Sequence, residues 1–110
     1  MAYDEGLADR IRQVLRDEAG LTEKRMFGGL AFLVNGNLAV SASSRGGLLL
    51  RVDPADTPDL VGRAGAARFE MRGRPMDGWL HIDPAGLGTE RGLESWVSRG
   101  VSYARALPPK

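Results

Sequence analysis

The sequence contains no cysteine and a single histidine, and these two shortages exclude much of the chemistry available to a small protein. Without cysteine the chain has no disulfide, no thiolate nucleophile and no thiolate metal ligand. One imidazole and scattered carboxylates do not supply the ligand set of a zinc site. No apolar run approaches the roughly 18 residues that suggest a membrane-spanning helix. We therefore expect no bound metal, no cofactor and no membrane partner.

The remaining composition is that of an ordinary globular protein. Hydrophobic residues make up 43% of the chain and charged residues 26%, which excludes a disordered or membranous class. A length of 110 residues suits one domain with its own core, over residues 1–110. The first five residues contain neither the basic nor the apolar stretch of a signal peptide. We expect a cytoplasmic protein.

The net charge of +1 argues against non-specific binding of nucleic acid by the whole surface. The charge alternates along the chain, and residues 24–52 contain four basic and no acidic residues. Residues 61–76 form a second basic block. Folding either interleaves these blocks into a mixed surface or brings both to one face of a sheet, and the charge pattern leaves both outcomes open.

The two ends of the chain have the apolar periodicity of amphipathic helices. Residues 5–19 are predicted to form the first helix, with Asp4 as its N-cap and Gly20 just past its end. Residues 89–106 are predicted to form the last, with Thr89 as its N-cap.

The middle of the chain alternates between strand patterns and turn residues. Residues 31–34, 38–42 and 48–52 predict three antiparallel strands, the first two joined by an Asn35-Gly36 turn. A brief helix capped by Asp56 or Thr57 follows, and then two strands near residues 69–71 and 79–82. The predicted α+β fold has the order α-β3-α-β2-α, in two layers: an antiparallel sheet with the helices packed on one face. An extra short strand at residues 24–27 remains an option.

Catalysis finds little support in the residue pattern. His81 and Asp83 would share one face of a strand and are the available acid-base pair. No serine stands in a G-x-S-x-G elbow, and the Gly28-Gly29 pair is not followed by the Gly-Lys-Ser/Thr of a phosphate loop. We predict that the protein is not an enzyme and that His81 is an ordinary strand residue.

Two basic turns are the best candidates for binding. The stretch from Glu23 to Phe32 places two cations, a Met-Phe pair and two glycines between a helical pattern and a strand pattern. Consecutive glycines let the backbone turn where side chains would clash. The predicted interaction surface consists of Lys24, Arg25, Phe27, Gly28, Gly29, Arg72 and Arg74. Its partner would be another protein. A small anionic ligand held by the glycine turns and arginines is the alternative, and direct nucleic-acid binding is a weaker one.

Several motifs together resemble the N-terminal domain of the TfoX/Sxy family, which is associated with natural competence in bacteria. They are Arg25-Met26-Phe27-Gly28-Gly29, the strand Leu30 to Val34 with its Asn35-Gly36-Asn37 turn, the block Met71 to Met76 before Trp79, and the helix ending Tyr103-Ala104-Arg105. The resemblance implies a stand-alone domain with the α-β3-α-β2-α order. It also implies a regulatory or adaptor role in transcription, beside an activator of the cyclic-AMP-receptor type. The expected partner is a transcription factor, a polymerase or a second copy of the chain.

Overall fold

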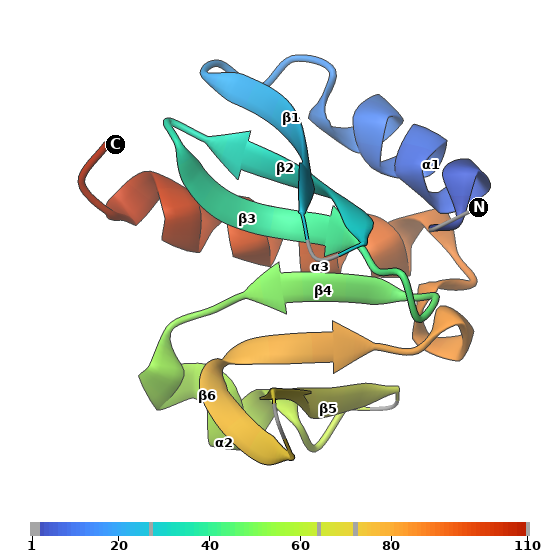
Figure 1. Cartoon of the computed structure of the whole chain (residues 1–110), viewed down its shortest axis with the longest axis vertical. Coiled ribbons are helices and arrows are strands. Elements are labelled where there is room, and N and C mark those ends of the chain that lie inside the picture. Colours follow the sequence, from blue (N-terminus) through green and yellow to red (C-terminus); the bar gives the residue numbers. More distant parts are fainter. Residues whose placement is uncertain (1–2, 27, 64, 72, 110) are drawn as a thin grey trace.

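The computed structural model describes residues 3–26, 28–63, 65–71 and 73–109. Within them, three α-helices accompany a six-stranded antiparallel sheet (Figure 1). The helices are α1 (Glu5–Leu15), α2 (Thr57–Leu60) and α3 (Glu90–Ala106). The strands are β1 (Leu21–Met26), β2 (Gly29–Val34), β3 (Asn37–Ala42), β4 (Leu48–Arg51), β5 (Ala66–Met71) and β6 (Arg74–Ile82). They lie in the order β1-β2-β3-β4-β6-β5. The predicted α+β class is confirmed.

The predicted element order needs one correction, because four strands rather than three precede α2. The additional strand is β1, which the sequence suggested only as a short option at residues 24–27. Its middle residues, Thr22 to Arg25, are all exposed. A strand at the edge of a sheet that is wet on both faces has no apolar alternation. For this reason the pattern that predicted β2, β3 and β4 missed β1.

Both long helices begin where the capping residues predicted. The Asp4 carboxylate accepts a hydrogen bond of 3.1 Å from the Leu7 amide, and the Thr89 hydroxyl accepts one of 3.0 Å from the Gly92 amide. The first helix is shorter than predicted, because α1 ends at Leu15 and the chain turns before reaching β1. The prediction for α3 agrees with the structure to within one residue.

The short helix α2 is capped differently from the prediction. Asp56 precedes it without a side-chain capping bond, and Asp53 instead caps the 3₁₀ turn Pro54–Asp56. The Thr57 side chain is fully buried and accepts a hydrogen bond of 2.8 Å from the Gly78 amide. Thr57 therefore links α2 to β6.

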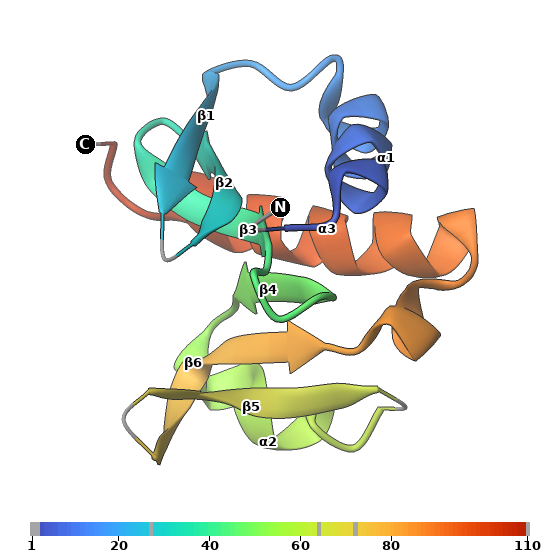
Figure 2. The same ribbon diagram turned by 45° about the vertical axis from the view of Figure 1, so that its right-hand side comes forward.

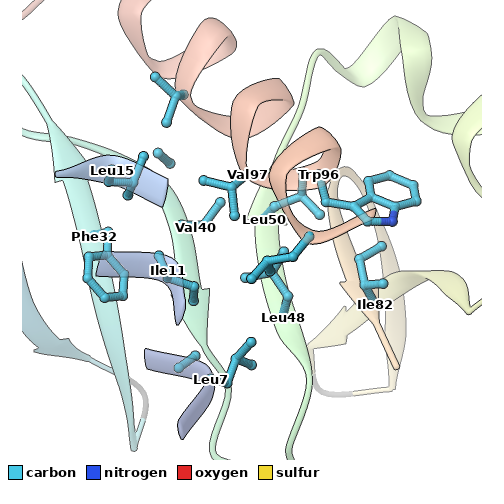
Figure 3. Packing of buried hydrophobic residues seen from close by; sticks show 14 of the residues in the cluster. Leu7, Ile11, Leu15, Phe32, Val40, Leu48, Leu50, Ile82, Trp96 and Val97 are labelled. Atoms are coloured by element: carbon cyan, nitrogen blue, oxygen red, sulfur yellow. The ribbon is translucent and has the colours of Figure 1, made fainter. Parts of the chain in front are cut away.

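A single apolar cluster joins the sheet to the helices (Figure 3). Strand residues such as Phe32, Val40 and Leu50 meet Ile11 of α1 and Val97 of α3, and all five are fully buried. Helix α3 crosses behind β3 and β4 in Figure 1, and it also contacts α1. Strands and helices therefore contribute to one core, and the strands at the two ends of the sheet form its edges.

Candidate interaction surface

The glycine pair of the predicted surface lies in the hairpin between β1 and β2. Met26 pairs with Gly29 across it. Gly28 has a φ of +77°, and a Cβ atom on Gly29 would lie 2.2 Å from the Ala42 carbonyl oxygen of β3. The hairpin thus needs a left-handed residue followed by one without a side chain. This backbone requirement accounts for both glycines without any ligand.

Strand β1 places its charged residues on an open edge of the sheet. Because β1 ends the strand order, its neighbour among the described strands is β2 alone. Lys24 and Arg25 are both exposed, and consecutive residues of a strand point to opposite faces. Neither side chain makes an ion pair or a hydrogen bond with the residues that the structure describes. Two adjacent positive charges therefore stand free on the edge.

The acidic residue of β1 is neutralised from α1. Arg12 Nε lies 2.8 Å from Glu23 Oε2, and Arg12 Nη2 lies 3.0 Å from Glu23 Oε1. These hydrogen bonds from Arg12 lower the pKa of the Glu23 carboxyl, and hydrogen bonds to Glu23 and then Asp9 raise the pKa of the Arg12 guanidinium. The pairing links β1 to α1. It also leaves Lys24 and Arg25 as the uncompensated charge of the strand.

Arg74 lies far along the sheet from these two residues. It is the first residue of β6 and pairs with Met71 next to the turn between β5 and β6. Strand order separates β6 from β1 by three strands, and Figures 1 and 2 show β1 and the β5–β6 hairpin at opposite ends of the molecule. The β1–β2 hairpin brings together Lys24, Arg25, Gly28 and Gly29, whereas Arg74 belongs to the distant β5–β6 hairpin. Phe27 and Arg72 lie outside the described residues.

His81 is engaged in holding a loop. Its Nε2 atom lies 2.7 Å from the carbonyl oxygen of Gly46 in the β3–β4 loop, and its Nδ1 atom lies 3.7 Å from Asp83 Oδ1. A carbonyl only accepts, so Nε2 bears the proton. Among the described residues, no group of three or more His, Cys, Asp or Glu side chains is placed to hold a metal.

Two hollows in the surface lie away from the residues that an anionic ligand was expected to contact. One of about 470 Å³ runs between α3 and the segment after β4, with Asp53, Asp56 and Arg99 among its lining residues. Another of about 270 Å³ lies beside α1 and is lined in part by Arg10. Neither is lined by Arg25, Gly28, Arg74 or His81. The expected pocket of glycine turns and arginines is not formed by these two hollows.

Sequence reasoning missed the cation–aromatic contacts of the sheet. The Arg51 guanidinium lies 5.3 Å from the ring centroid of Trp79 and 5.7 Å from that of Tyr103. These contacts join β4, β6 and α3, which are distant in sequence, so no local motif could signal them. They occupy Arg51, which distinguishes it from the free Lys24 and Arg25.

Comparison with known proteins gives one positive result. Residues 13–104 match the sequence model of the TfoX N-terminal domain. No curated protein and no solved structure matches the chain. Within the described part of the chain, no helix has the length and apolar character needed to cross a membrane.

Proposed function

The chain belongs to the TfoX N-terminal domain family, and from this premise we propose that it is a non-enzymatic regulatory domain that acts by binding another protein. The observation that supports the proposal most directly is the open edge of β1. Its two unpaired cations lie directly before the turn of the family signature, on a strand that has room for a neighbour. Exposed strand edges are a recurrent way for one protein to bind another.

The chemistry of the described residues favours binding over catalysis. The imidazole of His81 donates from Nε2 to the Gly46 carbonyl oxygen, and this contact gives it a structural role in holding the β3–β4 loop. The family resemblance suggests the regulation of transcription, including competence, as the process involved. A transcription factor or a polymerase subunit is the proposed partner.

Affinity capture from the native cytosol tests the proposal. The tagged wild-type domain is compared with Lys24→Glu/Arg25→Glu, and nuclease is added to half of each sample. A matched control, Arg74→Glu/Arg91→Glu, changes the net charge equally at exposed residues away from β1. We expect the wild-type domain to capture a protein, and we expect this capture to persist when nuclease is added.

The other results have clear meanings. Material that disappears with nuclease indicates nucleic acid as the partner and contradicts the proposal. Capture of no protein under any condition also contradicts it. Loss in the β1 variant, but not in the control, assigns the contact to Lys24 and Arg25.

A further inference from the structure

We infer that β1 takes an extended acidic segment of the partner protein as a seventh strand of the sheet, with two consecutive carboxylates opposite Lys24 and Arg25. The inference rests on the proposed protein-binding function and adds the binding mode and the chemistry of the partner. It begins from three observations. The edge is open, its two central cations are unpaired, and the neighbouring Glu23 is already neutralised by Arg12.

The backbone of β1 supplies the binding mode. A strand at the end of a sheet presents amide and carbonyl groups that have no neighbour strand on their outer side. Six residues, Leu21 to Met26, are paired with β2 in unbroken register. This length matches an ordinary strand and so gives an added strand a full set of partners. The paired inner side holds β1 extended before any ligand arrives.

The faces of β1 determine where the partner's charges must lie. Lys24 and Arg25 are consecutive and therefore point to opposite faces of the sheet. Directly opposed residues of paired strands share a face, so each cation needs its own acid, and the two acids must be consecutive as well. Leu21 and Met26, at the two ends of β1, are half-buried and favour apolar residues opposite them. From its N-terminus, an antiparallel partner strand therefore has the order apolar, acidic, acidic, neutral, neutral, apolar. Its first residue lies opposite Met26 and its last opposite Leu21.

A second copy of the chain does not fit this edge. Two antiparallel copies of β1 related by a two-fold axis must place one residue opposite its own copy, because opposed residues share a face. A register centred on Glu23 or Lys24 pairs five residues of each copy but sets that charged residue against its own copy. Registers centred on Thr22 or Arg25 pair only three residues of each copy. The same charges hinder pairing with neutral strands, which gives the edge selectivity for an acidic segment.

Synthetic peptides provide a defined test. The probe is acetyl-Val-Glu-Glu-Thr-Thr-Val-amide, in the antiparallel order, and its controls are the Lys-Lys counterpart and a form with alternate backbone amides methylated. Binding is followed by NMR shifts of the ¹⁵N-labelled domain, which detect weak complexes. We expect the probe to shift amides of residues 21–26 and to bind about 10-fold more tightly than the Lys-Lys peptide, from two cross-strand charge pairs.

Charge reversal sharpens the test. Lys24→Glu/Arg25→Glu should bind the Glu-Glu peptide about 10-fold more weakly than wild type does, and it should bind the Lys-Lys peptide more tightly. The control Arg74→Glu/Arg91→Glu should keep the wild-type preference. Circular dichroism confirms that both variants are folded.

Three results overturn the inference. The first is undiminished binding of the methylated peptide, which indicates charge attraction without strand pairing. The second is an unchanged peptide preference in the β1 variant. The third is no binding of the probe by the wild-type domain. If the cytosolic capture still yields a protein in any of these cases, the proposed function stands and the β1 binding mode is wrong.

Discussion

Replacement of Gly29 by alanine tests whether the glycine pair serves the backbone. The added Cβ atom would lie 2.2 Å from the Ala42 carbonyl oxygen, whereas ordinary contacts begin near 3.4 Å. Strand β2 must therefore move away from β3 by about 1.2 Å at this point. The shift weakens local pairing, including the 3.1 Å hydrogen bond from the Ser41 hydroxyl to the Leu30 carbonyl. Overpacking costs about 1–3 kcal/mol and a lost hydrogen bond about 1 kcal/mol. We therefore expect Gly29→Ala to lower the free energy of unfolding by about 2–4 kcal/mol.

Gly28→Ala is the matched comparison, because it has a different physical cost. Gly28 has a φ of +77°, and its added Cβ atom would meet the Ser44 Cβ at 3.2 Å, a milder contact. A left-handed alanine costs about 1–2 kcal/mol, and asparagine tolerates this conformation better. The expected order of destabilisation is Gly29→Ala, then Gly28→Ala, then Gly28→Asn.

Urea denaturation at 25 °C, followed by circular dichroism, measures these losses directly. Thermal unfolding should show a decrease of about 10–20 °C in the midpoint for Gly29→Ala. A Gly29→Ala variant with wild-type stability would refute the reasoning. If it also lost its captured partner, the glycine would belong to the binding site instead of the fold.

Three further substitutions have expected results of their own. Glu23→Gln should cost less than about 1 kcal/mol at pH 7 in urea denaturation, because the pair with Arg12 is partly exposed. Arg12 lowers the pKa of Glu23 in the folded state, so this difference should shrink as the pH falls below about 4.5, and a difference that persists at pH 2.5 would contradict the assignment. Asn37→Ala should lower the free energy of unfolding by about 1–2 kcal/mol, since it removes two hydrogen bonds to the end of α3. Hydrogen exchange of the backbone amides in that region should become faster. Thr57→Val should cost about 1–3 kcal/mol by leaving the Gly78 amide unpaired, and a neutral result by thermal unfolding would contradict that role.

Much of the fold could be predicted from local signals. Asp4 and Thr89 are oxygen-bearing residues placed directly before helical periodicity, and both act as N-caps. The Asn35-Gly36 turn has positive φ angles at both residues, as the hairpin required. These features depend on residues within a few positions of one another, which is the range over which sequence patterns are informative.

The arrangement of the candidate surface depends on longer-range pairing. Arg25 and Arg74 look alike in the sequence, since each lies beside a glycine-containing turn, but they belong to hairpins at opposite edges of the sheet. The separation arises because β3 and β4 lie between the β1–β2 hairpin and the β5–β6 hairpin, and no local pattern encodes that strand order. The neutralisation of Glu23 by Arg12 likewise depends on where α1 packs. Only the fold therefore distinguishes the free cations from the paired ones.

Hydrogen exchange measured by mass spectrometry on the domain, free and bound to its captured protein, tests the central claim most directly. If the domain acts by binding a partner strand at β1, the backbone amides of residues 21–26 should exchange more slowly in the complex. Residues near Arg74 and on the exposed face of α3 should be unchanged. Protection at either of those places, with β1 exchanging as in the free domain, would contradict the claim.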